Sequence, residues 1–112
     1  MAETFTNSTV KLTTLDATDI YQAPTGNAAD RAVVLSCMVA NLVLFNRDVI
    51  IVITDAANNV LSTLIHNVTV PPKATLEAIP NKVILKQSQK LRATPSDATG
   101  VEITVSALEV VS

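Results

Sequence analysis

The segment 32–55, AVVLSCMVANLVLFNRDVIIVITD, constrains the fold of this chain more than any other part of it. It is long and apolar enough to suggest a membrane span, but Asn46-Arg47-Asp48 interrupts it with two charges that hydrocarbon does not tolerate. Its many β-branched residues disfavour a helix. We therefore predict two strands, 32–41 and 48–55. The unbroken apolar run Val49–Ile53 predicts a central strand that is apolar on both faces.

The rest of the chain repeats short extended segments separated by turns. Each expected strand alternates apolar and polar residues or is rich in β-branched residues, and proline follows several of them. The further expected strands are 9–13, 19–22, 60–70, 75–79, 83–85, 90–94 and 101–106. Strands at intervals of about ten residues are typical of sandwiches and jelly rolls. We predict an all-β fold, an antiparallel, jelly-roll-like β-sandwich of about eight strands.

The length of 112 residues suits one domain with a single core. We predict this domain over residues 9–112. Residues 1–8 lack clear alternation and are predicted to form an N-terminal arm. No basic start precedes an apolar stretch, so we expect no signal peptide. A lone cysteine, Cys37, cannot form an internal disulfide, which agrees with folding in a reducing cytoplasm.

Residues suited to catalysis are scarce in this sequence. His66 is the single histidine, and Cys37 lies in an apolar strand, where a thiol usually acts as a small inert hydrophobe. Ser36, His66 and Asp55 can be combined into a triad on paper, but no nucleophile-elbow glycines surround the serine. We therefore predict that the chain is not an enzyme, with no catalytic residues, no cofactor and no metal.

The chain has few charged residues, and positive and negative charges nearly balance. Charged residues make up 16% of the chain, against about 25% in an ordinary soluble domain, and the net charge is −2. We therefore expect neighbouring chains to cover part of the surface; the alternative is a monomer kept soluble by threonine and asparagine. Lys82, Lys86, Lys90 and Arg92 are predicted to lie on the solvated face of an edge strand. The alternative is that they contact an acidic neighbouring subunit. Since basic residues are spread thinly, we expect no nucleic-acid partner, and no membrane partner.

Three parts of the sequence resemble small β-sandwich virion proteins of tailed bacteriophages. They are a tyrosine–proline entry with the strand after it, a crossing that contains valine and proline, and a closing pair of strands. The segments are 20–24 with 31–34 and 39–41, then 68–76, then 85–94 with 107–110. The chain departs from the family pattern at Ser88-Gln89, where the family usually has Gly-Asp, so the tight turn there must form without glycine.

The resemblance implies a non-enzymatic structural protein of a virion, assembled in the cytoplasm of the bacterial host. Among such proteins it favours a capsid decoration or cement protein that binds and stabilises the outer surface of the capsid shell. Its partners would be the major capsid protein and further copies of itself, as a dimer or trimer. A tail fibre, knob or baseplate component that contacts the host surface is the alternative within the virion. A cellular binding domain of unrelated origin is a further alternative.

Bulky apolar residues beside expected loops are the candidate contact residues. Phe5 lies in the predicted arm, and Leu42, Leu44 and Phe45 lie in the connection between the first two predicted apolar strands. Arg47 follows directly after them. We predict that these five residues contact the partner protein. The alternative for the connection is that its apolar residues add to the core.

Overall fold

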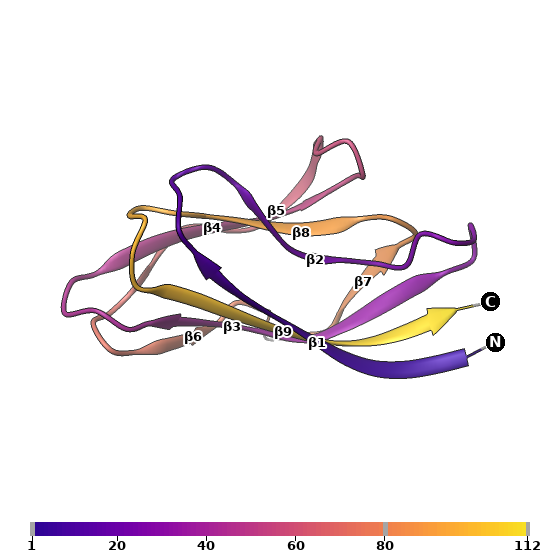
Figure 1. The fold of residues 1–112 in the computed structure, drawn as a ribbon, viewed down its shortest axis with the longest axis horizontal. Coiled ribbons are helices and arrows are strands. Elements are labelled where there is room, and N and C mark those ends of the chain that lie inside the picture. Colours follow the sequence, from indigo (N-terminus) through magenta and orange to yellow (C-terminus); the bar gives the residue numbers. More distant parts are fainter. Residues whose placement is uncertain (1, 80, 112) are drawn as a thin grey trace.

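The structure, a computed structural model, describes residues 2–79 and 81–111 (Figure 1). Over these residues the chain forms two antiparallel sheets and no helix. The strands are β1 (Ala2–Leu12), β2 (Thr18–Gln22), β3 (Arg31–Asn41), β4 (Arg47–Thr54), β5 (Val60–Val70), β6 (Thr75–Glu77), β7 (Val83–Lys86), β8 (Lys90–Pro95) and β9 (Val101–Val111). The predicted all-β antiparallel sandwich is confirmed.

Each sheet combines strands that are distant in the sequence. One sheet has the order β1-β9-β3-β6, with β7 also paired to β3, and the other has the order β2-β8-β4-β5. β7 pairs with the first part of β3, and β6 pairs with its last part. Figure 1 shows the two sheets as layers. The two chain ends lie together at one end of the sandwich, and the connection between β3 and β4 lies at the other.

The apolar run 49–53 lies in β4, between β8 and β5. Val49 and Ile51 are fully buried, whereas Ile50 and Val52 are half-buried on the opposite face. This confirms the predicted inner strand with apolar residues on both faces. Among the residues that the structure describes, no helix is long and apolar enough to cross a membrane.

Residues 2–8, which we expected to form an arm with Met1, are instead the first part of β1. They pair with β9 over their whole length, in the same register as the rest of the strand; Met1 lies outside the described residues. Their alternation is hidden because the core-facing positions here hold threonine and serine. One of these, Ser8, donates from Oγ to the carbonyl oxygen of Ile20 at 2.7 Å. This segment is therefore an edge of the sandwich.

A further strand boundary differs from the expected one, and one expected turn is confirmed. β9 continues to Val111, beyond the predicted 101–106, because both β1 and β3 pair with its last part. The turn between β7 and β8 forms without glycine, as the sequence required. Ser88 there adopts a φ of 64°, and the N–H of Gln89 donates to the carbonyl oxygen of Lys86 at 3.1 Å.

We expect Ile51→Ala to lower the free energy of unfolding by about 2–5 kcal/mol, because it leaves a cavity at a fully buried site of an inner strand. Urea denaturation followed by circular dichroism measures the change. Ile84→Ala is the matched control: this side chain is 60% exposed, so its truncation should cost less than about 0.5 kcal/mol. Equal losses in the two variants would contradict the placement of Ile51.

Candidate functional site

The connection between β3 and β4, residues 42–46, is called the end loop here because it lies at one end of the sandwich (Figure 1). Its side chains Leu42, Leu44 and Phe45 are 55%, 69% and 70% exposed. These values exclude the alternative that the three side chains add to the core. Grouped apolar side chains at the surface are typical of interaction sites.

The end loop is held from inside by the side chain of Asn41, which is 1% exposed. Its amide nitrogen donates to the carbonyl oxygen of Phe45 at 2.7 Å. The same nitrogen lies 3.0 Å and 3.2 Å from the carbonyl oxygens of Val70 and Pro71. Its amide oxygen accepts from the N–H of Val43 at 3.1 Å. One side chain therefore joins the beginning and the end of the loop to the end of β5.

Backbone contacts fix the end loop to the neighbouring connections. The N–H of Leu42 donates to the carbonyl oxygen of Gly100 at 2.8 Å, and the N–H of Lys73 donates to that of Val43 at 3.2 Å. Gly100 has a φ of 88°, and a Cβ at this position would lie 2.5 Å from Cγ1 of Val43. Only glycine suits so close an approach in this backbone conformation.

Arg47, a predicted contact residue, is only 8% exposed. Its guanidinium donates to the carbonyl oxygens of Thr99 at 3.0 Å and Asn46 at 3.1 Å, and it lies 3.7 Å from the Asp97 carboxylate. Hydrogen bonds from Thr99 and the charge of Arg47 lower the pKa of Asp97. The guanidinium therefore joins β4 to the β8–β9 connection, and we correct its role from a contact residue to a positioning residue.

Phe5 lies apart from the end loop. It is 76% exposed on β1, opposite Leu108 of β9. β1 comes near the end loop only at Leu12, about 23 Å further along the strand, where it pairs with Val101. The predicted contact residues therefore form two separate surfaces, one at the end loop and one on β1.

Asn41 and Gly100, which shape the end loop, were not among the predicted site residues. The available signals were a polar residue at the end of an apolar strand and a glycine in a chain that contains only two. Neither signal identifies the residues that Asn41 and Gly100 contact. Val70, which accepts a hydrogen bond from Asn41, is 29 residues away in the chain.

The residues weighed for catalysis are dispersed. Cys37 is fully buried in β3, where burial and then the Glu77 carboxylate raise the pKa of its thiol to about 12. His66 is exposed on β5, at the edge of the other sheet. Asp55 accepts from the N–H of Asn59 at 2.9 Å in the turn after β4. Across residues 2–79 and 81–111 there is no group of three His, Cys, Asp or Glu side chains able to hold a metal ion.

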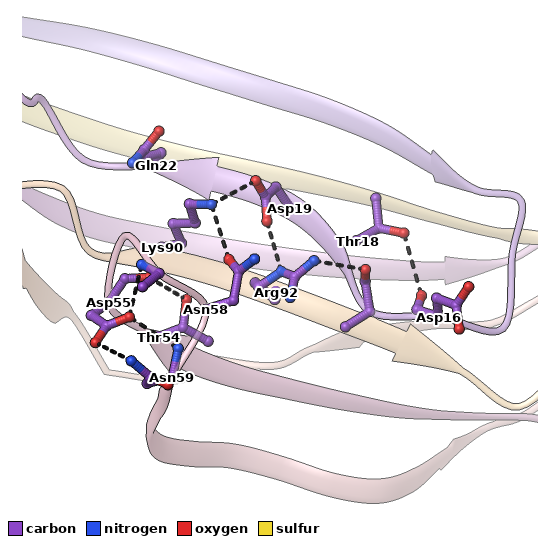
Figure 2. Close-up of polar contacts among 12 residues, drawn as sticks. Asp16, Thr18, Asp19, Gln22, Thr54, Asp55, Asn58, Asn59, Lys90 and Arg92 are labelled. Atoms are coloured by element: carbon purple, nitrogen blue, oxygen red, sulfur yellow. Dashed lines mark hydrogen bonds and ion pairs between the residues drawn. The ribbon is translucent and has the colours of Figure 1, made fainter.

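The basic residues Lys90 and Arg92 lie on β8, which is an inner strand of its sheet and not the predicted edge. Figure 2 shows both pointing at Asp19 of β2, with nitrogen–oxygen distances of 3.1 Å and 2.7 Å. Lys90 also donates to Oδ1 of Asn58 at 3.0 Å. These cations therefore hold β2 and the β4–β5 turn against β8.

No protein-family model and no curated protein matches this chain. The resemblance to virion proteins of tailed bacteriophages therefore stays a prediction.

We expect Asn41→Ala to lower the free energy of unfolding by about 3 kcal/mol, because it leaves buried backbone groups of the end loop and β5 without their partner. Thermal and urea unfolding measure this loss. Asn46→Ala is the matched control in the same loop; its side chain is exposed and its loss should cost less than about 0.5 kcal/mol. A wild-type stability for Asn41→Ala would contradict the structural role of its amide.

Acid should weaken the contact between β2 and β8. Burial raises the pKa of Asp19, but the hydrogen bonds and charges of Lys90 and Arg92 outweigh it and hold the pKa below 3.8. Because the folded pKa is the lower one, Asp19 stabilises the fold above pH 3.8, and this contribution is lost as the pH falls through the folded pKa. Urea midpoints should therefore fall in acid, and fall less for Asp19→Asn. The same decline in both proteins would contradict this role.

Proposed function

We propose that this chain is a non-enzymatic structural protein that attaches to the surface of another protein through its end loop. One observation carries the proposal: Leu42, Leu44 and Phe45 are exposed on a loop whose backbone is tied down by a buried amide. A loop that is already ordered loses little conformational entropy when it binds. The arrangement therefore suits adhesion to a fixed surface.

The end loop can supply a moderate binding energy. Full burial of a leucine or phenylalanine side chain contributes about 1.5–3 kcal/mol. Because the three side chains are 55–70% exposed, their burial would contribute about 4 kcal/mol, before the entropy cost of association is subtracted. A contact of this strength holds firmly only when several copies act together on a repeating surface.

The repeating surface in this proposal is the shell of a tailed bacteriophage, to whose small virion proteins the sequence is similar. The chain is then a capsid decoration or cement protein, and the major capsid protein is the partner of the end loop. The charged fraction of 16% supports this role, because covering a surface with few charges by neighbouring proteins costs little desolvation free energy.

A tail fibre, knob or baseplate component is the second candidate function. It is favoured by the exposure of both phenylalanines, Phe45 at 70% and Phe5 at 76%. Exposed aromatic residues are expected of a protein that contacts glycans on the host surface. The two rings lie on separate surfaces, so each would have to act alone.

The double substitution Leu44→Ser/Phe45→Ser tests the role of the end loop. Phage heads purified from a virus deleted for this gene are mixed with the purified chain and sedimented. The wild-type chain should sediment with the heads, and the variant should lose at least about tenfold in affinity, because two apolar side chains are removed from the contact. Val60→Ser/Leu61→Ser is the matched control, since these side chains are 61% and 52% exposed on β5, far from the end loop.

Each other outcome is informative. Failure of the wild-type chain to sediment with heads would contradict the decoration role. Equal binding by the end-loop variant and the wild-type chain would contradict attachment through the end loop. Binding to purified tails, and not to heads, would support the second candidate.

A further inference from the structure

β1 is a long and regular strand at the edge of its sheet. It has eleven residues and pairs with β9 in unbroken register from Ala2 to Leu12. The residues between Glu3 and Lys11 are uncharged, and the strand contains neither proline nor glycine. A long uncharged edge without a bulge is a template for pairing with another strand.

The other edge strands lack this combination. β6 and β7 have three and four residues, and β2 has five, with a register shift between Asp19 and Tyr21. β5 is as long as β1, but its pairing with β4 shifts register at three places and Asn67 has a φ of 52°. Short or irregular edges discourage strand pairing. Among the strands that the structure describes, β1 is therefore the edge best suited to it.

The charges of β1 are symmetrical about Asn7. Glu3 stands four residues before it and Lys11 four residues after it. All three side chains point away from the core side of the strand, which holds Val10 and Leu12. In an antiparallel pair of β1 strands centred on Asn7, Glu3 faces the partner's Lys11, and the same contact repeats at the other end of the ladder.

We infer that two copies of this chain form a two-fold dimer by antiparallel pairing of their β1 strands, with Asn7 on the axis. Every pair in this register joins two odd-numbered or two even-numbered residues. The N–H and C=O groups of β1 that point away from β9 therefore face the corresponding groups of the partner's β1. A ladder from residue 3 to residue 11 contains about eight to ten hydrogen bonds, a usual number for a protein interface. At each end of the ladder, Glu3 of one copy lies opposite Lys11 of the other, and such a pair of opposite charges is stabilising.

The dimer also gives the exposed ring of Phe5 a neighbour. Phe5 pairs with Leu108, Leu108 with Val33, and Val33 with Ile84, so a row of apolar side chains crosses the solvent-facing side of the sheet from β1 to β7. At β1 this row ends with a ring that is 76% exposed. In the dimer that ring lies beside the partner's Thr9, and the sheet continues into the second copy.

Asn7→Cys places a single accessible thiol on the proposed axis. Facing Cα atoms of an antiparallel ladder lie about 4.5–5.5 Å apart, within the range of a disulfide. The native Cys37 is fully buried and does not compete. With oxidised glutathione, the full chain carrying Asn7→Cys should form a covalent dimer on a non-reducing gel.

Thr9→Cys is the matched control on the same face of the same strand. In the inferred register this thiol faces the partner's Phe5 and lies about 13 Å from the equivalent position of the partner, too far for a disulfide. It should therefore stay monomeric on the gel. Equal cross-linking of both variants, or of neither, would overturn the inference.

A charge exchange tests the same register without a covalent bond. Glu3→Lys and Lys11→Glu each place like charges opposite one another at both ends of the ladder, and each should weaken the dimer about tenfold or more in sedimentation experiments. An equimolar mixture of the two variants should dimerise again, because a strand with two lysines then meets a strand with two glutamates. Lys82→Glu, in an exposed loop, should leave the wild-type dimer unchanged.

A wild-type chain that is monomeric at about 100 μM, or a mixture of the charge variants that does not associate, would overturn the inference. The inference stands apart from the proposed function, since these measurements need no phage particle. Leu44→Ser/Phe45→Ser should leave the dimer intact, because the end loop lies beyond the Leu12 end of β1.

Discussion

The two sheets are held together by one apolar cluster to which both contribute fully buried side chains. Val39 and Ile103 come from the sheet that contains β1, and Val49 and Ile51 from the sheet that contains β4. Because β4 is an inner strand, its burial requires β8 on one side and β5 on the other. Closing the sandwich around this strand directs the connections to the two ends of the molecule and leaves β1 at an edge.

At the end of the sandwich that carries the end loop, two polar side chains are buried and three apolar side chains are exposed, which reverses the usual arrangement. Asn41 and Arg47 are buried and bonded to backbone carbonyls, whereas Leu42, Leu44 and Phe45 on the loop between them face solvent. The buried polar groups keep the loop ordered while its apolar groups stay available for contact. If the inferred dimer forms, antiparallel pairing directs the two end loops to opposite ends of one rigid unit. Attachment at both loops would then be stronger than attachment at either one.

Periodicity was most informative where residues face the common core. The run 49–53 predicted an inner strand because a strand covered on both faces accommodates such a run. The polar interruption at 46–48 predicted where the end loop lies. It did not predict whether Leu42, Leu44 and Phe45 are exposed, because the same sequence is compatible with an extension of the core. Residues 2–8 were misassigned because threonine and serine occupy their core-facing positions, and the two-residue period disappears there.

Contacts between distant segments account for the remaining differences. Besides their neighbours in the loop, Asn41 bonds to the end of β5 and Arg47 to the β8–β9 connection, and no local pattern predicts these distant contacts. The amino-acid sequence by itself determined an all-β chain with an apolar inner strand, because side-chain branching and spacing act on the backbone locally. Only the tertiary structure decided which apolar residues face solvent, which polar residues are buried and which strand forms the open edge. Those properties depend on which segments become neighbours.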